Sequence, residues 1–239
     1  GSFIALLSIE EFLVVKYLDI IKKQIILKDV NDLSKENGFI SLSNNQKESL
    51  LVKSGGEAHH EKIPNIKEFD YSKTFSLSSE YKKSYLMHAP IGPSAACAFF
   101  DENLTVFSHS QALFALKNSL STYFDIDKDR VTLKHVPGSG CYGHNGADDV
   151  AFEAAVLSKE FPKNHILLKW TREDEHCWEP YGSASINKIK CVIESQGKII
   201  YWSNEAYADT YLSRPSESEL FNFISFKFLT NDFTEKKST

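Results

Sequence analysis

Apolar and polar positions change their spacing along the chain, and these changes divide it into three regions. Residues 1–30 contain short apolar runs at 3–7 and 25–30, which predict strands on either side of an amphipathic stretch. Residues 31–73 are rich in Ser, Asn, Lys and Glu, whereas residues 74–239 alternate short apolar runs with helical spacing. Strands interspersed with helices in this way predict a mixed α+β fold.

The first region contains a predicted amphipathic helix over residues 9–21. Apolar side chains recur at every third position from residue 12 to residue 21. Glutamates stand at 10–11 and lysines at 22–23, which suits the positive amino end and the negative carboxyl end of a helix. We expect this helix to serve packing rather than chemistry.

The second region, 31–73, has the composition of a linker or insertion. Its most distinctive residues are the adjacent His59 and His60. Adjacent side chains point in different directions in regular structure, and no third ligand is near them in the sequence, so we expect a solvated segment rather than a metal site.

The third region predicts strands separated by two helices. The helices are expected at 111–124 and 148–159, where apolar residues recur at helical spacing. The expected strands are the apolar runs at 84–90, 95–101, 104–110, 131–136, 166–170, 188–195 and 198–205.

Four glycines are concentrated in GSGCYGHNGADDV, residues 138–150, which follows the expected strand at 131–136 and runs into the expected helix at 148–159. Glycines allow positive φ and let a ligand approach the main chain, so such a loop can turn its amides toward an anion. No Lys-Ser/Thr follows the last glycine, which excludes a Walker loop, and G-x-G-x-x-G fits only as Gly138, Gly140 and Gly143.

The two aspartates that follow the loop support a different interpretation. Asp148 and Asp149 would repel a phosphate unless they faced away, but both suit the first turn of a helix. The residues alone therefore leave two interpretations open, a cofactor cradle and a tight turn with a helix cap, and they favour the turn.

Composition and charge exclude several classes of function. A net charge of −5 and a pI near 5.9 provide no basic field for nucleic acid. No apolar run is long enough to predict a membrane span, and Glu10 and Glu11 interrupt the only stretch that resembles a signal sequence. The four cysteines are far apart, which predicts neither an iron–sulfur cluster nor a structural zinc in this chain and favours a reducing compartment.

Two further groups of reactive residues have weaker support as sites. The acidic run at 173–176 cannot converge on one ion from consecutive positions, so we expect a polar turn or a salt-bridged surface near Arg172. Cys141 with His144 could form a nucleophile pair, but no third group is placed to orient it, so a cysteine hydrolase is disfavoured.

Four blocks in fixed order resemble the molybdenum-cofactor-binding subunit of the xanthine dehydrogenase and aldehyde oxidase superfamily. The resemblance is greatest to the large subunits of bacterial nicotinate and isoquinoline hydroxylases, and it covers roughly residues 1–215. The blocks are HAPIGPSAACA (88–98), LTVFSHSQ (104–111), VTLKHVPGSGCYGHNGADD (131–149) and LLKWTREDEHCWEPYG (167–182).

The resemblance implies a cofactor and a set of residues that bind it. The cofactor is molybdopterin with molybdenum, in bacteria usually as the cytosine dinucleotide. The glycine loop matches the position where the family's loop wraps the pterin. Gln111 matches the family's glutamine beside the metal's apical ligand, where an amide donates a hydrogen bond without adding charge. The implied cofactor-binding residues are Gln111, Gly140, Cys141, Tyr142, Gly143 and His144, with no protein ligand to the metal.

The resemblance also implies a domain organisation. Residues 1–30 resemble the end of an α/β hammerhead domain, 31–73 a linker or insertion, and 74–239 part of the molybdopterin-binding domain. The family's base, a glutamate near the end of the full subunit, has no counterpart here, so we expect the chain alone to be inactive.

The implied activity is hydroxylation of an aldehyde or an N-heteroaromatic carbon, with water as the oxygen source. Expected partners are a small subunit carrying a 2Fe-2S cluster, the remainder of the large subunit and a small-molecule substrate. The alternative is a non-catalytic remnant or interaction domain that keeps the fold without the cofactor. Relatives are cytoplasmic or periplasmic, and the sequence slightly favours the cytoplasm.

Overall fold

A four-stranded mixed sheet forms the centre of the α/β part of the molecule. The computed structural model describes residues 4–25, 73–208, 214–217 and 220–230. The strands are β2 (Ala95–Phe100), β3 (Leu104–Ser108), β4 (Val131–His135) and β5 (His165–Lys169), arranged in the order β4-β3-β2-β5. Only β3 and β4 are parallel, and the other neighbours are antiparallel.

Two helices cover one face of this sheet and form the core with it. Helix α4 (Leu113–Phe124) makes the crossover that the parallel pair β3 and β4 requires, with the short 3-10 helix η2 (Lys128–Arg130) before β4. Helix α5 (Ala147–Glu160) packs across β2, β3 and β5. Alternate strand residues face these helices, so the buried core includes Ala96, Ala98, Leu104, Val106, Leu116, Leu120, Val150, Phe152 and Ala154.

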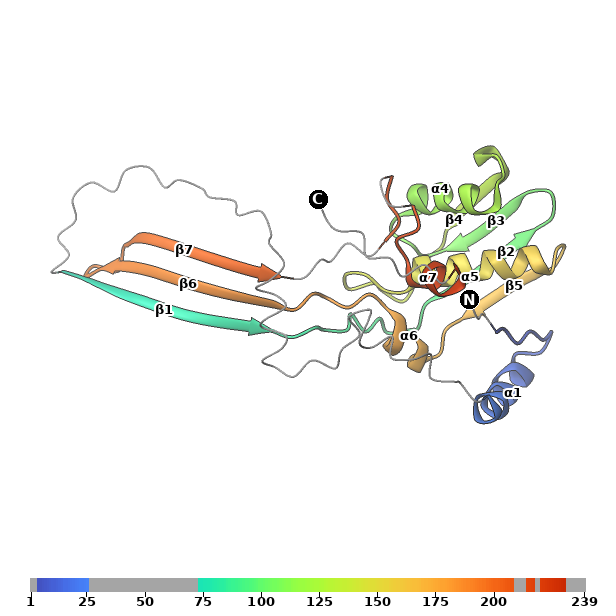
Figure 1. Ribbon diagram of the computed structural model, residues 1–239, viewed down its shortest axis with the longest axis horizontal. Helices are drawn as coiled ribbons and strands as arrows, with labels where there is room; N and C mark the ends of the chain where they lie inside the picture. Colours follow the sequence, from blue (N-terminus) through green and yellow to red (C-terminus); the bar gives the residue numbers. More distant parts are fainter. Residues whose placement is uncertain (1–3, 26–72, 209–213, 218–219, 231–239) are drawn as a thin grey trace.

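A second, three-stranded sheet extends away from the α/β part (Figure 1). Its strands β1 (Thr74–Lys83), β6 (Ser185–Glu194) and β7 (Ile199–Ala208) are antiparallel in the order β1-β6-β7. Leu77, Cys191 and Trp202 lie opposite one another, which places them on one face. That face is half open, because Leu77 is 52% exposed and Trp202 46% exposed.

Three further helices complete the described residues. Helix α1 (Glu11–Gln24) is at the position of the amphipathic helix predicted for residues 9–21, which is confirmed as a helix. Its Glu11 side chain forms an ion pair of 2.6 Å with Lys169 at the end of β5. Helix α6 (Arg172–Trp178) follows β5, and helix α7 (Ile224–Thr230) packs on α5. No helix in the described ranges is long and apolar enough to cross a bilayer.

The structure confirms most of the predicted elements in the third region. Strands β2 to β7 correspond to six of the expected apolar runs, and α4 and α5 to the two expected helices. The mixed α+β fold is therefore confirmed.

Two predicted strands are wrong, and other expectations are outside the described residues. Residues 4–7 are not a strand, because the described chain offers this apolar run no ladder partner. Residues 84–90 carry a single bridge, Leu86 to Gly182, because the strand pairing with β6 ends at Lys83. The strand expected at 25–30 and the linker expected at 31–73 are outside the described residues, apart from their end positions.

Candidate functional site

The glycine loop connects the end of β4 to the start of α5, at one end of the four-stranded sheet. Its backbone turns sharply, because Gly140 has φ +95°, Tyr142 φ +53° and Gly143 φ +135°. The two glycines occupy conformations that residues with a Cβ rarely adopt. The clustering of glycines in the sequence therefore reflects the shape of this loop.

Side chains hold the loop, while its central amides stay open. The Cys141 thiol donates to the carbonyl of Gly143 over 3.1 Å and accepts from the amide of Asn145 over 3.4 Å. The Asn145 carboxamide donates to the carbonyl of Gly140 at 3.2 Å. Within the described part of the chain, the amides of residues 140–143 donate to no acceptor.

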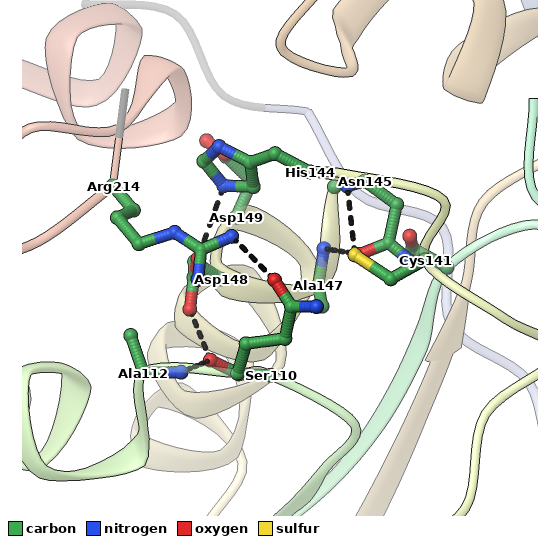
Figure 2. Close-up of polar contacts among 12 residues, drawn as sticks. Ser110, Ala112, Cys141, His144, Asn145, Ala147, Asp148, Asp149 and Arg214 are labelled. Carbon is green, nitrogen blue, oxygen red and sulfur yellow. Dashed lines mark hydrogen bonds and ion pairs between the residues drawn. The ribbon is translucent and has the colours of Figure 1, made fainter. Parts of the chain in front are cut away.

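Asp148 links the loop to the segment that contains Gln111. One carboxylate oxygen accepts from the hydroxyl of Ser110, and the other lies 3.3 Å from Nε2 of His144 (Figure 2). Gln111 follows Ser110 directly, and its Oε1 accepts from the guanidinium of Arg214 at 2.9 Å. The structure thus brings the strand end that carries Gln111 together with the loop that carries His144.

The two aspartates occupy the first turn of α5, as the sequence predicts, but both are buried. Asp149 turns toward α7 and accepts from the amide of Ser225 at 2.7 Å. Burial raises the pKa of Asp149 to about 7, against the opposing effect of the hydrogen bonds from Ser225. Because Asp149 faces α7 and Asp148 is paired with Ser110 and His144, neither carboxylate is an unpaired charge beside the loop amides.

His144 has a structural partner other than Cys141. Its imidazole pairs with Asp148, while the Cys141 sulfur bonds to main-chain groups of the loop. These contacts do not form a nucleophile pair, which agrees with the low expectation for a cysteine hydrolase. Among the described residues, no group of three or more His, Cys, Asp or Glu side chains is placed to hold a metal ion.

The acidic run at 173–176 lies in a helix, so the expected polar turn is wrong. For the alternative, a salt-bridged surface near Arg172, Glu173 and His176 are exposed, but the Arg172 guanidinium donates to the carbonyl of Ile91. Thr171 and Asp174 form a capping box at the start of α6, with the Thr171 hydroxyl accepting from the amide of Asp174 at 3.1 Å. Glu175 points inward and is fully buried. The motif Thr-x-x-Asp was the available signal for the helix, but nothing local indicated the burial of Glu175.

Glu175 joins three segments of the site. Its carboxylate accepts from the amide of Ser94 at 2.6 Å, from the Ser94 hydroxyl at 3.0 Å and from the amide of Gly146 at 3.2 Å. Ser94 precedes β2, and Gly146 is the residue at the start of α5. A buried carboxylate with three donors fixes where α5 begins, and hence where the glycine loop ends.

A groove of about 420 Å³ borders the other end of the loop. Gly138 and His109 line it together with apolar strand residues such as Phe107 and Leu167. The His109 ring lies against Gly138, where an added Cβ would come within 2.8 Å, and its Nε2 accepts from the amide of Ala95 at 3.3 Å. Burial lowers the pKa of His109, which favours the neutral imidazole.

Comparison with known proteins identifies relatives of the chain. Residues 54–231 match the family of the molybdopterin cofactor-binding domain. A nicotinate dehydrogenase subunit of Pseudomonas putida is 36% identical over 124 residues, which are 52% of this chain and 10% of that protein. The matched part of the chain therefore spans about a tenth of the length of this relative.

Solved structures of similar fold share little sequence with the chain. Quinoline 2-oxidoreductase from Pseudomonas putida 86 has a TM-score of 0.49 at 10% identity, covering 55% of this chain and 17% of that one. Aldehyde oxidoreductase from Desulfovibrio gigas has a TM-score of 0.44 at 15% identity, covering 52% and 14%. On the strength of the family match, the chain belongs to the molybdopterin cofactor-binding domain family of xanthine dehydrogenase-type enzymes.

Proposed function

We propose that this chain supplies one side of the molybdopterin site of a molybdenum hydroxylase. The observation that carries the proposal is the set of open amides at residues 140–143, positioned through Asp148 beside the segment of Gln111. In a chain of this family, the main-chain amides of such a loop are suited to bind an anionic cofactor through hydrogen bonds.

The residues present fit the chemistry of that cofactor. The loop amides of residues 140–143 would hold its anionic groups, in a backbone conformation that positive φ at Gly140 and Gly143 allows. Arg214 occupies Oε1 of Gln111, which leaves the Gln111 NH₂ group to donate without adding charge. Once bound, molybdopterin with molybdenum would supply hydroxylation of an aldehyde or an N-heteroaromatic carbon, with oxygen from water.

We propose that Gln111, the loop residues 140–143 and His144 are the cofactor contacts of this chain. His144 would act by fixing the loop to Asp148, since its ring is already 3.3 Å from that carboxylate. Cys141 and Tyr142 would contribute main-chain amides, because the Cys141 side chain is engaged within the loop.

The complete enzyme would contain further parts. The relative in Pseudomonas putida is named as one subunit of a nicotinate dehydrogenase and is about ten times longer than the matched segment. We propose the cytosine dinucleotide form of the cofactor, a partner subunit with a 2Fe-2S cluster, and completion of the site by the remainder of the large subunit, without which these residues do not turn over substrate. The four free cysteines support a reducing, cytoplasmic compartment.

A binding measurement tests this proposal. The purified chain is titrated against the air-oxidised, fluorescent derivative of molybdopterin cytosine dinucleotide, with fluorescence anisotropy as the readout. We expect binding by the native chain, weaker binding by Gln111→Ala, and native binding by Gly197→Ala, a change in the turn between β6 and β7. Absence of binding by the native chain, or equal binding by the Gln111 variant, would contradict the proposal.

The second candidate is an interaction domain without cofactor. It is favoured by the half-open apolar face of the β1-β6-β7 sheet, where Phe75 is 50% exposed and Leu77 52% exposed. The same titration separates the two functions, because an interaction domain would leave the pterin probe unbound.

A further inference from the structure

Glu179 is a buried carboxylate that organises the turn before β2. It is the residue that ends α6, and its side chain is fully buried. Its Oε1 accepts from the amide of His88 and from the amide of Ala89, the latter at 3.4 Å. One carboxylate oxygen therefore holds two consecutive main-chain amides, 91 and 90 residues away in the sequence.

The turn held by Glu179 has a strained backbone. Ala89 has φ +51°, a left-handed conformation that is unfavourable for a residue with a Cβ. The flanking chain is fixed by reciprocal main-chain hydrogen bonds between Leu86 and Gly182, at 3.1 and 2.8 Å. Strain of this kind persists only where the surroundings impose it, and Glu179 is the side chain that binds this turn.

The turn places the imidazole of His88 against the glycine loop. A Cβ added to Gly143 would come within 2.3 Å of Cδ2 and 2.5 Å of Nε2 of His88. A Cβ on Gly182 would lie 3.6 Å from the same Nε2. The ring thus lies close to both glycines, and it fills the space that a side chain at position 143 would need.

The His88 and Glu179 side chains are costly to bury. Nδ1 of His88 and Oε2 of Glu179 are buried and have no hydrogen-bond partner among the described residues. Nδ1 lies 3.7 Å from Oε1 of Glu179, beyond the length of a good hydrogen bond. Buried polar atoms without partners lower the free energy of unfolding. Their presence beside the glycine loop therefore indicates a role other than stabilising the fold.

We propose that Glu179 and His88 are positioning residues that set the conformation of the glycine loop for its ligand. Glu179 fixes the turn, the turn fixes the His88 ring, and the ring supports Gly143. The part of this inference that concerns cofactor affinity rests on the function proposed above, whereas the part that concerns loop conformation does not.

The test uses the reactivity of Cys141, which is in the loop, as a local reporter. Glu179→Ala and His88→Gln are made in the full chain, and alkylation by iodoacetamide is followed at each cysteine by mass spectrometry. We expect faster alkylation of Cys141 in both variants, with an unchanged rate at Cys191, which is buried in β6 and reports global unfolding. The matched control is Glu173→Ala, at an exposed carboxylate of α6.

The pterin probe gives the second readout. We expect about tenfold weaker probe binding by either variant, the size typical of losing an outer-shell support. If Glu179→Ala does not fold, His88→Gln alone decides, because it leaves the Glu179 carboxylate in place.

The outcomes separate the two proposals. Unchanged Cys141 reactivity and unchanged probe binding in the variants overturn the positioning role while leaving the proposed function intact. Altered Cys141 reactivity in a chain that binds no probe supports the positioning role and overturns the proposed function.

Discussion

Oε1 of Glu175 accepts a hydrogen bond of 3.2 Å from the amide of Gly146, the residue from which α5 begins. The same carboxylate binds Ser94 through both its amide and its hydroxyl. The start of α5, the approach to β2 and helix α6 therefore meet at one buried carboxyl group. Because the glycine loop ends at Gly146, this contact makes the position of the loop depend on the position of α6.

Removing the Glu175 carboxylate should destabilise the whole α/β part. Glu175→Ala leaves the donors of Ser94 and Gly146 buried without an acceptor, and we expect a loss of about 3 kcal/mol in the free energy of unfolding. Urea unfolding followed by circular dichroism measures the loss. Glu173→Ala, on the exposed side of α6, is the control and should change stability little; equal effects of both substitutions would contradict the buried role.

Gly143→Ala and Gly197→Ala separate backbone strain from steric conflict. Both glycines have positive φ, +135° and +87°, but among the described residues an added Cβ meets the His88 ring at Gly143 and no atom within 4 Å at Gly197. We expect Gly197→Ala to cost about 1 kcal/mol from strain alone. Gly143→Ala should lower the free energy of unfolding further and should also weaken binding of the pterin probe. Urea unfolding and fluorescence anisotropy measure the two effects. Similar losses of stability at both positions would show that the His88 ring moves aside at little cost.

Asp149 should make stability fall as the pH rises. Its pKa is raised from 3.8 to about 7, so between these values the folded chain keeps a proton that the unfolded chain releases. The free energy of unfolding should decrease across this window, by at most about 4 kcal/mol at 1.4 kcal/mol per pKa unit, and then stay level. Urea unfolding at pH 4 to 8 measures it.

The Asp149→Asn variant supplies the control for that pH dependence. Asparagine keeps an acceptor for the amide of Ser225 and has no proton to lose in this range. Its stability relative to the native chain should therefore increase as the pH rises from 4 toward 7. A constant difference between the two proteins would mean that Asp149 is not the titrating group.

The capping box of α6 should contribute measurably to stability. Thr171→Ala removes the hydroxyl that accepts from the amide of Asp174, and we expect a loss of about 1 kcal/mol in urea unfolding. Thr171→Ser keeps the hydroxyl and should retain most of that stability. If serine and alanine behave alike, the hydroxyl is not the source of the effect.

Local pattern was sufficient to predict the elements that bury an apolar face. Strands β2 to β5 are short apolar runs, and helices α4 and α5 carry apolar residues at helical spacing, so the residues of each element are enough to predict its position. The glycine loop was found for the same reason, since positive φ at Gly140 and Gly143 is a local requirement.

The rest depends on partners far away in the sequence. Glu175 looks like a surface residue because it stands in an acidic run, and only Ser94 and Gly146, 81 and 29 residues away, make its burial possible. Residues 84–90 have the composition of a strand, but β6 offers pairing to residues 74–83 instead. The contact of His88 with Gly143 depends on Glu179, so no local pattern could reveal it.

The β1-β6-β7 sheet has a consequence for work with the isolated chain. Strands β1 and β7 lie at the edges of this sheet, and each is ten residues long, with apolar side chains such as Tyr81 (59% exposed) and Ile199 (53% exposed) open to solvent. Among the described residues, no further strand pairs with the outer edge of β1 or β7, and long unpaired edge strands template pairing with other copies. Light scattering from concentrated samples should therefore increase with added sulfate, and a mild detergent should keep the protein colloidally stable during titrations.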